Sequence, residues 1–347
     1  MTSTPPAPRI TLVDALSHTA DARRHARQSR WRRTWPLLIA IVLTIGLVIV
    51  SIFTGVADIT DMEGRGHEFL WITRIPRTVA LVLAGASMAM AGLVMQLMTQ
   101  NRFVEPTTVG TTEWAGLGLL LTYIFLPGSG LFAKIIVAIV FAFAGTLVFF
   151  AFLRRVTLKS SLIVPIIGIM LGAVVGAVST FLALEFNLLQ TLGGWFMGRF
   201  TGIEVGRYEP LWIVLFVAIA VVIVADRFTV AGLGKDIATN VGLNYERVVL
   251  LGVALVALTT GTVTVIVGAL PFLGLIVPNL VSVIRGDDLR SNLPWVFLTG
   301  IWIVTVCDLI GRTIIMPFEV PISLVLGVVG AVVFIAMLLR TRRSNVR

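Results

Sequence analysis

The residues with the most chemical potential in this sequence are carboxylates that lie inside apolar stretches. Glu113 and Asp308 lie well within such stretches, and Glu185 lies at the edge of another. A carboxylate inside a membrane is costly, so it usually faces the protein interior and serves in proton transfer or substrate contact. For Glu113, local pairing and substrate contact are equally compatible with the sequence. So few intramembrane carboxylates argue moderately against a proton-driven transporter.

Motifs of common nucleotide and metal sites are missing from the sequence. Segment 232–236 (GLGKD) has neither the spacing nor the hydroxyl residue of a phosphate-binding loop, and no H-E-x-x-H motif occurs. Cys307 is the sole cysteine, which excludes an internal disulfide and a cysteine-based metal site. We therefore expect no catalytic residue, cofactor or metal on this chain, and we expect another subunit to supply its energy.

Composition and hydropathy indicate an integral membrane protein. Charged residues make up 13% of the 347 residues, whereas a soluble domain carries about 25%. Several apolar stretches reach the roughly 20 residues that a membrane helix needs. We predict an all-α, polytopic protein with about ten spans. They lie near 35–56, 74–98, 107–126, 131–153, 161–185, 211–225, 294–311 and 321–340, with two more within 248–284.

The stretch 248–284 contains no charge and is too long for one span. Gly268 and Pro271 divide it, because proline removes a backbone donor and breaks a helix. The second of the two resulting spans is short for a full crossing. The span near 211–225 is also predicted to be short.

The net charge of +9 reflects membrane topology rather than nucleic-acid binding, because cytoplasmic loops carry an excess of Lys and Arg. With both termini inside, most of the 27 basic residues fall on inner segments. We therefore expect residues 1–34 to form a basic cytosolic tail, 35–340 to form one transmembrane domain, and 341–347 to form a cytosolic C-terminal tail. The lipid bilayer, and not nucleic acid, is the expected surrounding.

Three glycines at a spacing of four lie in the span near 161–185. Gly168, Gly172 and Gly176 fall on one helix stripe, and small residues let membrane helices approach closely. The stripe predicts tight helix packing, or a pathway-lining helix that slides, and the two are compatible.

Four segments, in order, resemble the FecCD family of ABC-importer permeases. They cover about residues 70–340 and comprise Arg74-Ile75-Pro76-Arg77-Thr78, Asn101-x-x-x-Glu105-Pro106 with Gly110, 234–243, and 268–279 followed by 308–312 and Glu319-Val320-Pro321. The chain departs from the family pattern at Phe103, at Pro271-Phe272 and at Asn279, where histidine is usual. At these positions the chain resembles a branch of the family that handles catecholate or related siderophores. In that branch, two different permease chains usually pair.

The resemblance implies a type II ABC-importer permease of the bacterial plasma membrane that carries ferric siderophore inward. Haem or cobalamin as cargo, and an ATP-independent secondary transporter, are the alternatives. A secondary transporter would need coupling carboxylates or inverted repeats, and the sequence has no convincing repeat. The implied partners are a cytosolic ATPase dimer that binds ATP and Mg²⁺, a substrate-binding protein and a second, related permease.

The resemblance also implies a coupling segment at 228–247 that inserts into the ATPase. An amphipathic helix resting on lipid is the alternative. Asp236 is expected to cap a short helix, and Gly242 is expected to end it with a positive φ. Ile237, Ala238 and Val241 are expected to form its apolar face. The residues assigned to this segment are Gly234, Lys235, Asp236, Ile237, Ala238, Asn240, Val241, Gly242 and Arg247.

Further roles follow from the resemblance at the outer side. Arg74, Arg77 and Arg312 are expected to dock carboxylates of the substrate-binding protein, although arginines at helix ends often reach only to lipid headgroups. A re-entrant helix is expected at 193–198. The residues assigned to the pathway or its gate are Glu113, Ser160, Ser161, Gly168, Gly172, Gly176, Trp195 and Met197.

Overall fold

The computed structural model describes residues 35–55, 66–155 and 163–344 of the chain, and these residues form helices and loops without a β-strand. The tails before residue 35 and after residue 344, with Ser160 and Ser161, lie outside the described residues. The N-terminal helix Trp35–Phe53 begins in one compact unit, Met1–Gly46, and ends in a second, Leu47–Arg347. Everything described below belongs to the second unit.

Nine long helices follow in the described part of this unit, with five short ones between them. The long helices are α3 (Ile75–Thr99), α4 (Thr111–Phe125), α5 (Leu131–Arg155), α6 (Ile163–Glu185), α8 (Trp212–Gly232), α10 (Tyr245–Ile266), α11 (Leu273–Arg285), α12 (Leu289–Thr313) and α13 (Ile322–Ser344). The short ones are α2 (Gly66–Phe69), η1 (Leu70–Arg74), α7 (Leu189–Phe196), η2 (Glu209–Leu211) and α9 (Lys235–Asn240).

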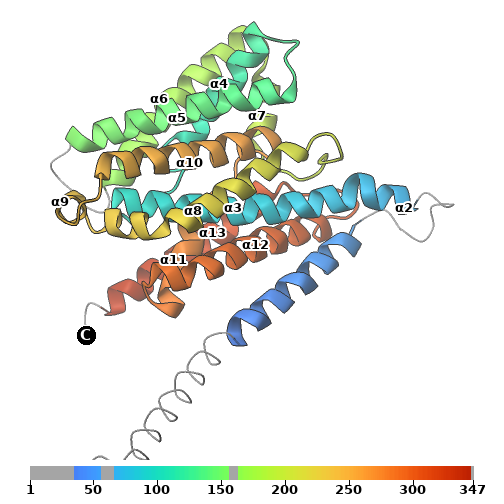
Figure 1. Ribbon diagram of the computed structural model, residues 1–347. Helices are drawn as coiled ribbons and strands as arrows, with labels where there is room; N and C mark the ends of the chain where they lie inside the picture. Colours follow the sequence, from blue (N-terminus) through green and yellow to red (C-terminus); the bar gives the residue numbers. More distant parts are fainter. Residues whose placement is uncertain (1–34, 56–65, 156–162, 345–347) are drawn as a thin grey trace, which may run out of the picture. The chain divides into compact units, whose positions relative to one another are not determined.

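Helix α3 lies at the centre of the unit, where it packs against α8, α10, α11 and α12 (Figure 1). Glycine pairs allow the closest of these contacts. A Cβ added to Gly92 would lie 2.2 Å from the Cα of Gly274, and one added to Gly85 would lie 2.7 Å from the carbonyl oxygen of Gly300. Such backbone contact is how membrane helices gain packing energy when lipid is as apolar as the side chains.

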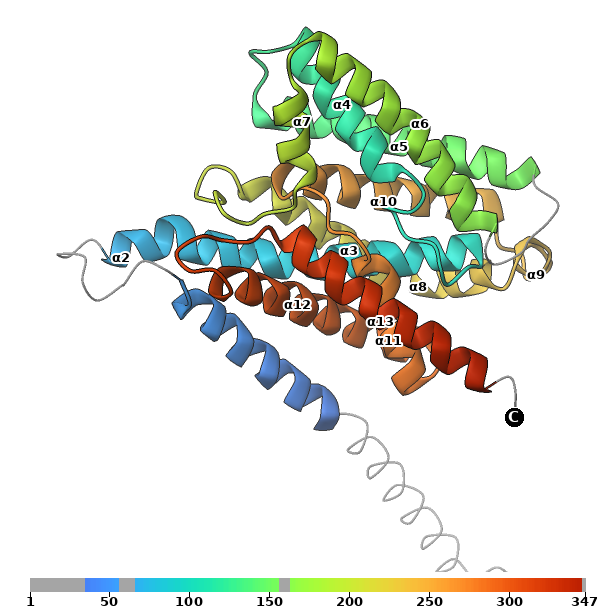
Figure 2. The same cartoon turned by 180° about the vertical axis from the view of Figure 1, so that it is seen from behind.

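Helices α4, α5 and α6 form a second group beside α10 (Figure 2). Helix α9 and the end of α13 lie at one end of the unit, and α2 and α7 lie at the other (Figures 1 and 2). We call these the α9 end and the α7 end. The long helices run between the two ends, and the loop after α3 meets the start of α11 inside the unit, where Phe272 donates to Glu105.

The predicted spans correspond to the nine long helices and the N-terminal helix. Among the residues described, seven helices are long and apolar enough to cross a membrane, and the apolar stretches Leu273–Arg285 in α11 and Ile322–Met337 in α13 are shorter. The break at Gly268 and Pro271 is confirmed, because α10 ends at Ile266 and α11 begins at Leu273. The span predicted as short at 211–225 is wrong, since α8 continues to Gly232 with Asp226 and Arg227 exposed on its surface.

Candidate functional site

Helix α9 is a six-residue helix held between two turns with positive φ angles. Gly234 has a φ of 113° just after α8, and Gly242 has a φ of 82° just after α9. A glycine adopts these angles without the steric cost that a Cβ imposes. The predicted positive φ of Gly242 is confirmed. The predicted cap by Asp236 is wrong, because the N-cap residue is Gly234 and no side chain caps the helix.

The apolar residues of α9 point in opposite directions. Ala238 is fully buried, whereas Ile237 and Val241 are 48% and 66% exposed. The three residues therefore do not form the single apolar face that the sequence suggested. One side of α9 packs onto the chain, and the other presents two aliphatic side chains outward.

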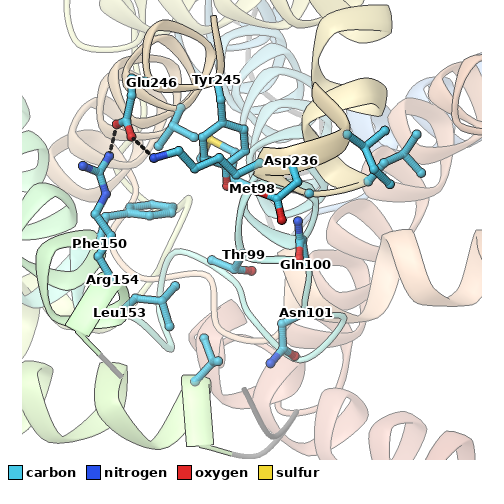
Figure 3. A pocket seen from close by; sticks show the side chains of 16 residues that line it. Met98, Thr99, Gln100, Asn101, Phe150, Leu153, Arg154, Asp236, Tyr245 and Glu246 are labelled. Atoms are coloured by element: carbon cyan, nitrogen blue, oxygen red, sulfur yellow. Dashed lines mark hydrogen bonds and ion pairs between the residues drawn. The ribbon is translucent and has the colours of Figure 1, made fainter. Parts of the chain in front are cut away.

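Ion pairs attach α9 to the helices beside it, as Figure 3 shows. Glu246, at the start of α10, accepts hydrogen bonds from Lys235 at 3.3 Å and from Arg154 at the end of α5. Beneath them is a cavity of about 770 Å³ that α3, α5, α9 and α10 enclose. The labelled side chains around it are Met98, Thr99, Gln100, Asn101, Phe150, Leu153, Arg154, Asp236, Tyr245 and Glu246.

The remaining polar residues assigned to the coupling segment are exposed. Asn240 lies at the last turn of α9, and Arg247 lies in the first turn of α10. The backbone N–H of Arg247 donates to the side chain of Asn244, which caps α10. This cap fixes where α10 begins relative to α9.

Glu105 is a functional candidate that sequence reasoning treated only as a letter of a motif. Its side chain is 1% exposed and accepts hydrogen bonds from the N–H groups of Phe272 at 2.9 Å and Leu275 at 3.1 Å. The Thr107 hydroxyl donates to it at 2.6 Å. Glu105 therefore caps the N-terminus of α11, where unpaired N–H groups and the helix dipole favour an anion.

Two amide side chains strengthen this junction between the loop after α3 and helix α11. Asn279 donates to the carbonyl oxygen of Arg102 at 2.7 Å, and Gln96 donates to that of Gly274 at 3.2 Å. Asn279 is the residue that departs from the usual histidine of the family pattern. Its amide gives the loop a direct contact with α11.

Two of the three stripe glycines lie against the loop that leads into α4. A Cβ on Gly168 would lie 2.4 Å from the carbonyl oxygen of Thr108, and one on Gly172 would lie 3.2 Å from the Cα of Gly110. A Cβ on Gly176 would meet nothing within 4 Å. The stripe therefore packs tightly at two positions and is open at the third.

Glu113 lies in the first turn of α4, beside α6. Its Oε2 is buried and has no hydrogen-bond partner among the residues described, and a Cβ on Gly172 would lie 3.6 Å from it. The local-pairing hypothesis requires a side chain that pairs with this carboxylate. Among the described residues, none pairs with its Oε2.

The three arginines expected at the docking surface form contacts within the chain at the α7 end. Arg312 is 1% exposed and donates to Asp308 and to the carbonyl oxygens of Ser51 and Thr54. Arg74 is buried and also donates to Thr54.

Arg77 belongs to the same network and is partly exposed. It pairs with Asp308 and with Glu319, each at 2.8 Å. Glu319 also accepts a hydrogen bond from Thr201. The network therefore ties α3, α12, the loop before α13 and the loop after α7 together with four charged side chains, Arg77, Asp308, Arg312 and Glu319.

The predicted re-entrant helix at 193–198 corresponds to α7, which ends at Phe196. Trp195 packs against Tyr123 with ring centroids 4.5 Å apart, and Met197 is 47% exposed. Both line a second cavity at the α7 end. Among the described residues, no group of three or more His, Cys, Asp or Glu side chains could hold a metal ion.

Comparison with known proteins gives a consistent result. The model of the FecCD transport family matches residues 37–340. The chain is 59% identical over 312 residues to the petrobactin import system permease protein FatD of Bacillus anthracis, covering 90% of this chain and 93% of that protein. It is 41% identical over 303 residues to the ferric-anguibactin transport system permease protein FatD of Vibrio anguillarum, covering 86% and 96%.

A solved structure gives the same fold. It is an inward-facing ABC transporter described as being of the metal-chelate type, with a TM-score of 0.76 and 22% sequence identity, covering 88% of this chain and 99% of that chain. The helical architecture is thus that of a type II ABC-importer permease. Family match, relatives and fold agree that this multi-pass membrane protein belongs to the FecCD transport family.

Proposed function

We propose that this chain is the permease subunit of an ABC importer that carries ferric siderophore into the cytoplasm. The observation that carries the proposal is the 59% identity to a petrobactin import permease over nearly the whole length of both chains. The relative at 41% identity is named for ferric-anguibactin. Cobalamin, one of the alternative cargoes, is named in relatives of lower identity, such as a vitamin B12 import permease at 30%.

The proposed energy source is a separate ATPase dimer that binds ATP and Mg²⁺ and contacts the α9 end. Ile237 and Val241 project from α9, and they suit an apolar cleft of a partner because Ala238 secures the opposite side. The ion pairs of Glu246 with Lys235 and Arg154 would pass a push on α9 to α5 and α10. Selection of the cargo would then lie with a substrate-binding protein and with the pathway.

The proposed orientation places the α9 end in the cytoplasm of a bacterium and the chain in its plasma membrane. Among the described side chains, the basic residues of the α9 end outnumber the six of the α7 end, in agreement with the excess of basic residues on cytoplasmic segments. Those of the α9 end are Arg102, Arg154, Arg155, Arg227, Lys235, Arg247, Arg285 and Arg290. Both termini would be cytoplasmic. A second permease, for which a related but different chain is favoured, would complete the pathway.

The substrate-binding protein is proposed to dock at the α7 end. Among Arg74, Arg77 and Arg312, the most accessible is Arg77, with 13% of its side chain exposed. A carboxylate on the partner would have to compete there with Asp308 and Glu319 for the same guanidinium. Docking through Arg77 would therefore loosen the buried network, and Arg312 would act by positioning Asp308.

The test is co-purification of the tagged chain from its native cells in mild detergent. Wild type is expected to retain an ATPase, and the double variant I237D/V241D is expected to lose it, because a cleft that accepts aliphatic side chains excludes carboxylates. R227D is the matched control, since it changes the net charge equally at an exposed site on α8. A wild-type chain that remains alone even after crosslinking would contradict the importer and favour a secondary transporter.

A further inference from the structure

The α7 end contains a cavity whose lining combines positive charge with aromatic faces. It measures about 810 Å³ and lies between α4, α5, α7, α10 and the loop after α7. It is separate from the cavity under α9. Its volume falls within the roughly 300–1,000 Å³ of sites for small molecules.

The charge around this cavity is of one sign. Lys134, Arg199 and Arg207 line it, and no Asp or Glu is among the described residues that do so. Three carboxylates contact the lining from outside it. Glu204 pairs with Arg207 at 3.8 Å, Glu209 accepts from the N–H of Gly206 at 2.6 Å, and Glu319 is engaged by Thr201 and Arg77. Like charges gathered around one cavity repel each other and attract an anion.

An aromatic wall faces the same space. Tyr123 and Trp195 stack with their centroids 4.5 Å apart and their planes inclined by 33°. The ammonium of Lys134 lies 3.9 Å from the centroid of the Tyr123 ring. This column of cation and two rings fixes α7 against α4 and α5, and it leaves Trp195 at the cavity wall.

A purely structural role would explain the stacked column but not the two arginines. Arg199 is exposed, and among the described residues its guanidinium donates one long hydrogen bond, of 3.3 Å, to the carbonyl oxygen of Gly194. Arg207 is 69% exposed. Packing within the chain therefore does not account for either of these exposed residues.

We propose that this cavity is a receiving site for a chelate that is anionic and bears aromatic iron-binding groups. The cations would neutralise the chelate, and the Tyr123–Trp195 wall would stack on its rings. The inference rests on the proposed importer function and adds a site within this chain that selects the cargo by charge.

The experiment follows tryptophan emission of the importer, purified with its native partners into discs of zwitterionic phospholipid. The probes are the negatively charged ferric complex of 2,3-dihydroxybenzoate and a neutral ferric trihydroxamate. The anionic complex is expected to quench a saturable component that W195F removes. R199Q/K134Q is expected to raise its Kd about tenfold or more, as the loss of two charge-assisted contacts implies, and R227Q is expected to leave it unchanged.

Three results would overturn the site. The first is equal Trp195-dependent quenching by both complexes, and the second is an unaltered Kd in R199Q/K134Q. The third is loss of the quenching when anionic lipid is added to the discs, which would identify a lipid headgroup as the occupant. Uptake of radioactive iron by cells carrying the same variants separates the hypotheses, because wild-type uptake without Trp195-dependent binding removes the site but keeps the importer, whereas no wild-type uptake removes the importer.

Discussion

At the scale of single residues, Glu105 is the group on which the interior depends most visibly. One buried carboxylate receives donors from the start of α11 and from its own loop. The loop between α3 and α4 has no helix of its own, so side chains supplement the few backbone hydrogen bonds within it, such as that from Val109 to Glu105 at 3.3 Å. Without Glu105, the N–H group of Phe272 would lose its acceptor, and that of Leu275 would keep only its 3.2 Å hydrogen bond to the carbonyl oxygen of Phe272.

Replacing Glu105 by Ala is expected to destabilise the protein, because each unpaired buried donor costs about 1–3 kcal/mol. Glu105→Gln retains one oxygen acceptor, so its unfolding temperature is expected to lie between those of wild type and Glu105→Ala. The measurement is the apparent unfolding temperature of the detergent-solubilised chain. If Glu105→Ala unfolds at the wild-type temperature, the cap does not stabilise α11.

Residue-level prediction worked where backbone geometry alone decided the outcome. Gly242 ends α9 at a positive φ because few other residues adopt that angle cheaply. It failed where a partner far along the chain decided the outcome. Nothing near Glu105 in the sequence indicates that its hydrogen bonds end at residues 272–275, and nothing near Arg312 indicates that its guanidinium is buried against the carbonyl oxygens of Ser51 and Thr54.

At the scale of elements, the glycine stripe of helix α6 differs in packing along its length. Gly168 and Gly172 contact the loop before α4, and Gly176 faces open space. The spacing of four predicted a common stripe but could not indicate which positions are covered. The length of α8 was likewise hidden, because Asp226 and Arg227 interrupt its apolar run while staying on an exposed surface.

Gly168→Ala and Gly176→Ala form a matched pair on one helix. The first places a Cβ 2.4 Å from a backbone oxygen and is expected to lower stability by about 1–3 kcal/mol, the usual cost of overpacking. The second meets open space and is expected to be neutral in the unfolding temperature. Equal changes in unfolding temperature for the two substitutions would mean that the backbone at Thr108 moves away from the added Cβ at little energetic cost.

At the scale of the whole described unit, ionic contacts differ between the two ends. The pairs at the α7 end are largely buried around Asp308. Those at the α9 end are exposed, including Arg102–Asp287 at 2.8 Å and Arg290–Asp226 at 3.4 Å. Salt screens exposed pairs far more than buried ones, so ionic strength should affect the α9 end first.

The Asp287 pair gives this asymmetry a pH dependence. The hydrogen bond from Ser282 lowers the pKa of Asp287 below its usual 3.8, burial opposes that shift, and Arg102 reinforces it. A lowered pKa stabilises the folded state above pH 3.8, and this stabilisation is lost as the pH falls through the folded value. Because Asp287 is mostly exposed, the contribution at pH 7 is at most about 1 kcal/mol.

Asp287→Asn is therefore expected to lower the unfolding temperature slightly at neutral pH, with the difference from wild type closing in acid. Asp226→Asn is the control for an exposed pair with a longer contact. Unfolding scans from neutral pH to below pH 3.8 provide the measurement. A difference that persists at the lowest pH would show that Asp287 acts through packing instead of charge.

The buried network of Arg77, Asp308, Arg312 and Glu319 has a mechanical consequence. It clamps the loops of the α7 end to α3 and α12, whereas the α9 end is joined by contacts that water can replace. Helices that are held rigidly at one end bend mostly near the other end. A displacement of α9 would then bend the helices near α9 and rotate the α7 end as a rigid body. The α7 end would therefore open by rotation, without a change in the distances within its network.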